Sequence, residues 1–259
     1  YRLLYPDHQP HTARGAKKSV LHDRLVAQNA YFKDVSGWES PSWYAPPGVE
    51  PVILSESFGR PHWFPYWEAE HKACRENVAL FDMSFMSKFL VQGYDAGRFL
   101  NRLSTANVNG DSNLITYTQW LNELGYLEAD LTVTKLSSNE FLVVATDTMH
   151  HHVLSHMTRR LSREWHATVT DVTARYAQIN LQGPRSRELL QLLTHANMMD
   201  FAFRSAQEID IGIARALCVR ITYVGELGYE LFIPAEQATS VYDRIVEAGR
   251  EFDLKHAGL

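Results

Sequence analysis

The chain has 259 residues, 45% hydrophobic and 21% charged, which allows a sizeable core in one or two domains. A formal net charge of −5 excludes the basic surface of a protein that binds nucleic acid or an anionic membrane, and no apolar run approaches the ~20 residues that span a bilayer. Cys74 and Cys218 lie far apart, so we expect buried free thiols in a reducing compartment and no disulfide scaffold.

The first 65 residues divide by composition into two segments. Residues 1–18 are polar, with Pro, Gly and a Lys pair, and are typical of a linker or the tail of a preceding domain. Residues 19–65 are rich in Pro and Trp. Six prolines and several aromatic residues fall in 37–65, so we expect irregular chain there, held in place by aromatic side chains. Residues 66–259 are expected to form the main domain.

The main domain alternates between strand and helix patterns. Helices are expected at 67–77, 96–103, 150–165 and 185–193, with a last helix opened by Pro234. Strands are expected at 89–92, 116–121, 131–136, 141–145, 178–181, 216–223 and 229–233. Strand pairs with short connections and packed helices predict an α+β fold with antiparallel sheets. Two similar blocks, before and after Asp171, suggest pseudo-repeated halves.

The stretch 115–130 contains the strongest candidate for chemistry. A strand pattern runs into a turn at Gly125, and a second strand places Asp130 at its head. Alternation puts Asp130 and Thr132 on one face and Leu131 on the other. A carboxylate there is costly to bury without a partner or a use. The pattern alone favours a structural carboxylate that caps a turn or pairs with a basic residue.

Four short motifs occur in a characteristic order along the chain. They are Phe-Asp-Met-Ser to Gln-Gly at 81–93, Tyr-Thr to Asp-Leu at 117–131, Leu-Gln-Gly-Pro at 181–184 and Tyr-Val-Gly-Glu-Leu-Gly-Tyr-Glu-Leu at 223–231. In this order they resemble the folate-binding aminomethyltransferase family, which includes the T-protein of the glycine cleavage system. The second motif departs from the family at Tyr126, where the family has a second Gly.

Two further features narrow the resemblance. Gly-Trp-Glu-Ser-Pro-Ser-Trp at 37–43 precedes a Pro-rich stretch, and Gly-Glu-Leu-Gly-Tyr-Glu occupies 225–230. Both resemble the C-terminal half of the flavoenzymes sarcosine dehydrogenase and dimethylglycine dehydrogenase. The resemblance covers about 19–259 and implies the ferredoxin-like halves of the aminomethyltransferase folate-binding fold. Complete members continue with an Arg-bearing helix and a C-terminal barrel, so we expect a piece truncated at its C-terminus, with that barrel missing.

The resemblance implies roles for individual residues. Asp130 falls on the family's essential acidic residue, which would stabilise an iminium cation and accept a proton from folate. We expect it to be partly buried. Glu230 matches the carboxylate that accepts hydrogen bonds from the pterin ring. The other residues expected to contact folate are Tyr117, Tyr223, Leu90, Met86 and Thr146.

Structural interpretations of these residues stay open. Tyr117 and Tyr223 suit cross-strand packing, and Glu230 suits the surface of an edge strand. Met86 and Leu90 suit an ordinary core equally well. Thr146 departs from the family, because T-proteins often have an Asn at its position.

A run of histidines raises the question of a metal. His150, His151 and His152 are consecutive, and His156 lies one helical turn after His152. No third ligand follows at a usual spacing, and the family that the chain resembles uses no metal. We therefore expect an exposed helix start and no metal site.

The expected function is the tetrahydrofolate-binding, one-carbon transfer part of a sarcosine or dimethylglycine dehydrogenase-type enzyme. It would capture the iminium or formaldehyde unit of an N-methylated glycine as 5,10-methylenetetrahydrofolate. FAD would belong to a domain of the full-length enzyme outside this chain, with an electron-transfer flavoprotein as its electron partner. The expected compartment is the mitochondrial matrix in a eukaryote and the cytoplasm in a bacterium.

Two alternatives stay open. One is a non-catalytic regulatory subunit resembling that of pyruvate dehydrogenase phosphatase, and the other is a free-standing T-protein. Asp130, Tyr117 and Glu230 together favour the enzyme over the regulatory subunit. The segment 37–43 argues against the free-standing T-protein.

Overall fold

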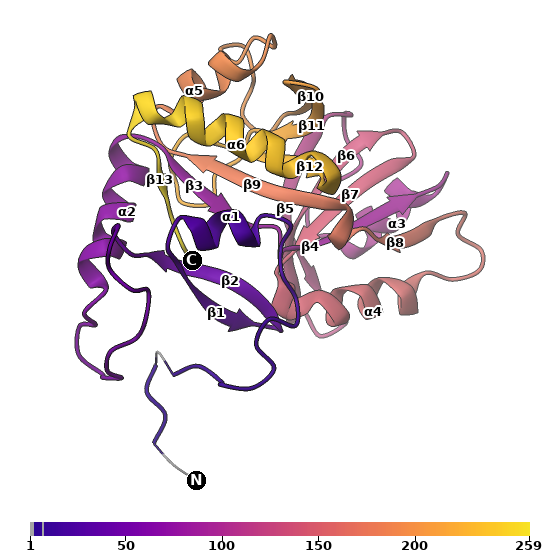
Figure 1. Cartoon of the computed structure of the whole chain (residues 1–259). Helices are drawn as coiled ribbons and strands as arrows, with labels where there is room; N and C mark the ends of the chain where they lie inside the picture. The colour runs from indigo at the N-terminus through magenta and orange to yellow at the C-terminus, as the bar shows by residue number, and fades with distance from the viewer. Residues whose placement is uncertain (1–2, 7) are drawn as a thin grey trace.

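Two large antiparallel sheets form the centre of the molecule (Figure 1). The computed structural model describes residues 3–6 and 8–259. The first sheet has the strand order β10-β11-β12-β9-β3-β13, and only its short β13–β3 pair is parallel. In that order the strands are Ala206–Ile211, Ala214–Val219, Gly228–Pro234, Tyr176–Gln182, Ala79–Asp82 and Lys255–His256.

The second sheet has the order β5-β6-β7-β4-β8, and all its pairs are antiparallel. In that order the strands are Leu114–Leu121, Leu127–Ser137, Glu140–Ala145, Ser87–Gln92 and Thr168–Asp171. The central strand β7 is an apolar, β-branched run and is buried on both faces from Phe141 to Ala145. Such a run fits a strand that is covered on both sides.

Helices cover the outer face of each sheet, and a third apolar cluster joins the two inner faces. The first sheet is covered by α1 (His22–Ala27), α5 (Ser186–Leu193) and α6 (Ala238–Gly249). The second is covered by α3 (Ala96–Leu103) and α4 (His150–Arg160). The helix α2 (Phe64–Glu76) packs through Cys74 against β3. Short 3₁₀ turns occupy Asp147–Met149, Thr173–Arg175, Ala235–Gln237 and Arg250–Phe252.

The chain order repeats itself, as the sequence predicted. The series β4-α3-β5-β6-β7-α4-β8 returns as β9-α5-β10-β11-β12-α6-β13. Equivalent strands take equivalent places in the two sheets, except that β3 is inserted between β9 and β13. The first half ends at Asp171, the last residue of β8. The α+β fold with antiparallel sheets is therefore confirmed, and the described residues contain no barrel.

The N-terminal region is more regular than expected. The strand β2 (Trp38–Tyr44) pairs with β1 (Ala30–Val35), so the prediction of irregular chain over 37–65 is wrong for its first part. Pro41 is tolerated because this sheet has only two strands and its register shifts beside Phe32, the partner of Pro41. Residues 1, 2 and 7 of the expected linker lie outside the described residues.

Smaller differences concern where elements end. The helix α4 stops at Arg160, five residues before the expected end, and Trp165 packs back against Phe99 at a ring separation of 6.2 Å. The strand β11 ends at Val219, four residues before the expected end.

Cys74 and Cys218 are free and buried, as expected. No helix within the described residues has both the length and the apolar character to cross a membrane.

Candidate functional site

A cleft of about 830 Å³ opens between the two sheets. One wall comes from β5, β6 and β7, and the other comes from β9 and β12. Six of the seven residues that the sequence singled out line this cleft. They are Met86, Tyr117, Asp130, Thr146, Tyr223 and Glu230.

Leu90 does not line the cleft, so the structure does not bring it together with the other six residues. Its side chain is buried in the apolar cluster that joins the two sheets, together with Leu142 and Phe232. The strand β4 is buried from Ser87 to Val91, so an apolar residue in its middle serves the core. The interpretation of Leu90 as ordinary core is therefore the one that the structure supports.

Asp130 lies on β6 and is held by two neighbours on β5. Tyr117 Oη donates a hydrogen bond to Asp130 Oδ2 at 2.7 Å, and Gln119 Nε2 donates to Oδ1 at 3.1 Å. The alternation of β6 holds, since Leu131 is buried while Asp130 is exposed. Asp130 is thus more exposed than the partial burial we expected. The carboxylate is oriented by its neighbours and open to the cleft.

Tyr117 is coupled to this carboxylate. Its hydrogen bond to Asp130 raises the pKa of the Tyr117 hydroxyl above its usual value, because the donor proton is held by a carboxylate. The side chain is 58% exposed, so it does not serve as cross-strand core packing. Tyr223 is 61% exposed and Phe203 is 56% exposed, and both line the same cleft. Three half-open aromatic rings around one cleft are suited to flank a planar ligand.

Glu230 occupies a central strand rather than an edge. The strand β12 lies between β11 and β9, and the Glu230 side chain is only 8% exposed. Asn180 Nδ2, on the facing strand β9, donates to Glu230 Oε1 at 3.1 Å. Burial raises the pKa of Glu230 to about 7, although the Asn180 hydrogen bond and the charge of Lys88 oppose the shift. A buried carboxylate with so few donors is costly to maintain unless a ligand uses it.

A buried lysine accompanies Glu230 and was not anticipated. Lys88, on β4, is completely buried, and its Nζ donates to the carbonyl oxygens of Ser84 and Met86 at 3.1 and 2.7 Å. Burial lowers the pKa of Lys88 to about 7, with Asp82 and Glu230 acting in the opposite direction. Met86, whose backbone holds this lysine, lines the cleft.

The inner face of β9 is polar and buried, which sequence reasoning missed. Gln178, Asn180 and Gln182 alternate with the apolar residues Ile179 and Leu181, which point to the opposite core. Gln178 lines the cleft, and its Oε1 is buried with no hydrogen-bond partner among the described residues. The alternating amides Gln-Ile-Asn-Leu-Gln were a detectable signal, because buried amides need partners.

Arg204 is another residue that the sequence did not single out. It lines the cleft with φ +66°, and its Nε donates to the carbonyl of Ile115 at 3.2 Å. Nη2 of the same side chain lies 3.4 Å from Thr116 Oγ1. These bonds fix the connection before β10 against β5.

Thr146 follows the last residue of β7 and lines the cleft. Its hydroxyl donates a hydrogen bond to Asp147 Oδ1 at 3.3 Å.

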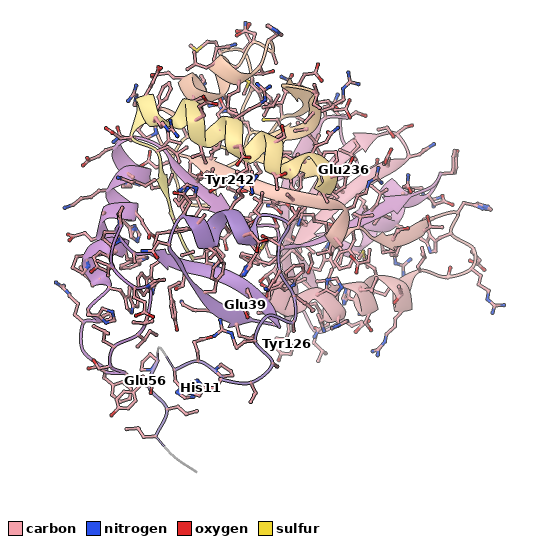
Figure 2. All side chains as sticks on the ribbon, viewed as in Figure 1. His11, Glu39, Glu56, Tyr126, Glu236 and Tyr242 are labelled. Carbon is pink, nitrogen blue, oxygen red and sulfur yellow. The ribbon has the colours of Figure 1, made fainter. Side chains whose placement is uncertain are left out.

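The turn that precedes Asp130 tolerates its departure from the family. Gly125 has φ +82°, a conformation that glycine adopts without strain, whereas Tyr126 does not have a positive φ. The Tyr126 side chain, labelled in Figure 2, is exposed. Asn122 Oδ1 accepts hydrogen bonds from the backbone N–H groups of Leu124 and Tyr126, each at 3.0 Å. The turn therefore needs only one glycine.

The histidine run begins the helix α4, as expected, but not all four histidines are exposed. His151 and His152 are exposed, but His156 is buried. His150 Nδ1 lies 2.9 Å from Ser87 Oγ, and its Nε2 lies 3.1 Å from Asp171 Oδ2. None of the four histidines lines the cleft.

Comparison with known proteins identifies one matching family model and several relatives of similar sequence. A family model described as the GCVT N-terminal domain matches residues 21–259. The chain is 38% identical, over its whole length, to 4-methylaminobutanoate oxidase (formaldehyde-forming) of Paenarthrobacter nicotinovorans, of which it covers 31%. It is 31% identical to the mitochondrial pyruvate dehydrogenase phosphatase regulatory subunit of Mus musculus, again over its whole length and covering 30% of that protein.

Human mitochondrial sarcosine dehydrogenase is 29% identical over the whole chain, which covers 32% of that enzyme. The chain thus spans about a third of the length of these curated relatives. The crystal structure of aminomethyltransferase T of the glycine cleavage system from Bartonella henselae matches with a TM-score of 0.75, over 93% of the chain and 59% of that structure. At 22% identity this match shows the shared fold alone. By its family model and its relatives, the chain belongs to the aminomethyltransferase family defined by the GCVT N-terminal domain.

Proposed function

We propose that this domain binds a reduced folate in the cleft between its two sheets and takes up a one-carbon unit there. The observation that carries the proposal is a pair of buried acceptors on one wall of the cleft. Glu230 offers a carboxylate that receives only one hydrogen bond from the described residues, and Gln178 offers an unpaired Oε1. A ligand edge with several N–H donors, such as the aminopyrimidine edge of a pterin, satisfies both.

The rest of the cleft fits the same ligand. Tyr117, Tyr223 and Phe203 supply exposed aromatic faces, and Met86 supplies an adaptable apolar surface. These side chains would hold the flat ring system while Glu230 and Gln178 fix its orientation. Thr146 would contact the folate through its hydroxyl. A reduced folate supplies two nitrogen atoms that together carry the one-carbon unit.

Asp130 would act on the incoming cation. Its carboxylate is open to the cleft and already oriented by Tyr117 and Gln119, so little reorganisation is needed when charge develops beside it. It would stabilise an iminium cation by charge and accept the proton that the folate nitrogen releases. Tyr117, hydrogen bonded to the same carboxylate, would hold it in place as the proton moves.

The names of two relatives support a source for the one-carbon unit. The name of the Paenarthrobacter relative describes oxidation of an N-methylamino acid with release of formaldehyde, and sarcosine is an N-methylated amino acid. We infer that the whole protein oxidises an N-methylated amino acid of this kind, sarcosine or dimethylglycine among them. An FAD-bearing domain outside this chain would perform the oxidation, with an electron-transfer flavoprotein as acceptor. The compartment would be the mitochondrial matrix in a eukaryote and the cytoplasm in a bacterium.

Calorimetric titration with tetrahydrofolate, under anaerobic conditions, tests the proposal. We expect the 259-residue chain to bind one folate, and Glu230→Gln to weaken binding at least tenfold, because the amide replaces one carboxylate oxygen with an NH2 group that donates and cannot accept from the pterin edge. Glu236→Gln makes the same chemical change at an exposed position and should leave affinity unchanged. Equal folate affinity of the chain and of Glu230→Gln would place the ligand elsewhere.

One relative supports a second candidate. The phosphatase regulatory subunit is 31% identical over the whole chain, so a regulatory role for this fold has a precedent in its name. A chain that binds no folate, yet folds with its cleft intact, would favour this role. A free-standing aminomethyltransferase is the third candidate, since the structural match to aminomethyltransferase T covers most of the chain. Amine oxidation by the whole protein would exclude it.

A further inference from the structure

Three metal-ligand side chains meet outside the cleft, between β6 and α4. They are Glu128 on β6 and His152 and His156 on α4, and one ligand atom from each lies within 4.8 Å of the other two. His152 Nε2 is 2.7 Å from Glu128 Oε2, and His156 Nδ1 is 3.9 Å from the same oxygen. None of the three lines the folate cleft. We propose that Glu128, His152 and His156 form a binding site for a divalent transition metal of the zinc type.

The donor set determines which metal fits. Two imidazoles and one carboxylate suit Zn²⁺, Co²⁺ or Ni²⁺, whereas Mg²⁺ and Ca²⁺ take oxygen ligands. Ligands around a tetrahedral Zn²⁺ with bonds of about 2.1 Å lie roughly 3.4 Å apart. The separations of 2.7 and 3.9 Å lie on either side of this spacing, so small side-chain movements complete the site. Water would take the fourth position on the exposed side of His152.

His156 provides a second and independent observation. The side chain is only 3% exposed, yet neither ring nitrogen makes a hydrogen bond with any of the described residues, and Nε2 is fully buried. Buried imidazoles normally have partners for their nitrogens. A metal bound through Nδ1 would give that nitrogen the partner it lacks, since Glu128 Oε2 at 3.9 Å is beyond hydrogen-bond distance, and Nε2 would keep its proton on the buried side of the ring. The ring is held for this role by stacking on Trp120, with centroids 5.6 Å apart and planes inclined by 18°.

The elements that carry the ligands are fixed by the core. Val153 and Met157, which follow His152 and His156 directly, are completely buried and anchor α4 to the second sheet. Ala129, next to Glu128, is buried in the same cluster. Ligands on rigid elements hold their geometry better than ligands on loops. Arg160, one turn after His156 on α4, forms an ion pair with Glu123 at 3.5 Å.

The third ligand explains why spacing rules fail here. Glu128 lies 24 residues before His152, and it reaches the histidine pair only because β6 and α4 pack side by side. A bound metal would therefore tie the start of β6, two residues before Asp130, to the helix on the outer face of the sheet. This connection is separate from the acceptors that we assign to folate, so the two proposals can fail independently.

Zinc titration of the metal-free 259-residue chain tests the site. Isothermal calorimetry with Zn²⁺ alone should give one ion per chain, and excess Mg²⁺ should not compete. We expect His152→Ala and Glu128→Gln each to weaken zinc binding at least tenfold. His151→Ala removes the exposed neighbour in the same run and should bind zinc like the unmodified chain. Cobalt should give the visible absorption of a tetrahedral site, which both ligand variants lose.

The ligand variants change partly exposed or exposed side chains, so they are expected to fold, and circular dichroism with thermal melting checks this. Zinc should raise the melting temperature of the unmodified chain and of His151→Ala, but not that of His152→Ala. Failure to bind zinc stoichiometrically would overturn the proposal. Unchanged zinc affinity in either His152→Ala or Glu128→Gln would overturn it too, because the ion would then lie elsewhere.

Discussion

Glu230 is predicted to lower the stability of the ligand-free protein, and Glu230→Gln should reveal by how much. Burial raises the pKa of this carboxyl from an ordinary value of 4.5 to about 7. The folded state therefore binds the proton more tightly than the unfolded state. The contribution of Glu230 to stability is fully present below pH 4.5 and is lost as pH rises through 7. At about 1.4 kcal/mol per pH unit, the loss reaches about 3 kcal/mol by pH 8.

The Gln side chain has the same shape and no charge. Its Oε1 still accepts the hydrogen bond from Asn180, so the change removes the buried charge and little else. Lys88, whose pKa is about 7, is itself mostly neutral at pH 8, so the loss of its counter-charge adds little there. We expect Glu230→Gln to be more stable than the unmodified chain by about 3 kcal/mol at pH 8, and by less than about 1 kcal/mol at pH 5.

Urea denaturation followed by circular dichroism at pH 5 and pH 8 measures both differences. Glu236→Gln is the matched control, since Glu236 is exposed at the start of the last helical segment (Figure 2), and its effect should stay within about 0.5 kcal/mol at both pH values. The reasoning is refuted if Glu230→Gln destabilises the protein at pH 8, or if its effect is the same at both pH values. A stabilised variant that has lost folate binding would show that the charge is kept for the ligand.

Four further outcomes are expected. Asp130→Asn should change the free energy of unfolding by no more than about 0.5 kcal/mol, because the side chain is exposed. In a stopped assay of the whole enzyme it should lower one-carbon transfer to tetrahydrofolate by about 10²-fold or more. Unchanged turnover would show that Asp130 takes no part in the chemistry. Tyr117→Phe should keep folate binding within about threefold and slow the same transfer by roughly tenfold, and a full-rate variant would contradict its positioning role. Gly183→Ala should destabilise by more than about 2 kcal/mol in urea denaturation, because φ is +128° and the new methyl would lie 2.3 Å from the Asn77 carbonyl oxygen. Gly125→Ala should cost only about 1 kcal/mol, because φ is also positive there, at +82°, but the new methyl would have no atom within 4 Å. Equal costs for the two glycines would contradict the steric argument.

The periodicity of apolar residues along the sequence predicted those helices and strands in which buried and exposed side chains alternate regularly. The helix over 96–103 has the expected ends because its apolar residues share one buried face and Arg98 and Arg102 lie on the exposed one. The strand carrying Asp130 showed the expected alternation, with Leu131 inward and Asp130 outward. The pseudo-repeat was visible as two blocks before and after Asp171, and the sheets reproduce it strand for strand. These features depend on neighbours close in sequence.

The remaining features depend on contacts between distant segments. The pairing of β9 with β12 brings together Asn180 and Glu230, which are 50 residues apart, and the central place of β12 in its sheet is what buries this carboxylate. The strand β2 was missed because Pro41 argues against a strand, and only its place in a two-stranded sheet makes the proline acceptable. Leu90 was assigned to the site from a motif, although its burial places it in the core. Motif order located most of the cleft, but not the depth of each side chain within it.

The central claim is that the cleft between the sheets binds a reduced folate through Glu230. Its most direct test is calorimetric titration of tetrahydrofolate into the chain at pH 8, where the carboxylate is ionised, beside Glu230→Gln and Glu236→Gln. We predict one binding site per chain, a loss of affinity of at least tenfold in Glu230→Gln, about 1.4 kcal/mol, and no change in Glu236→Gln. Equal affinity in all three proteins, or no binding by the unmodified chain, would contradict the claim.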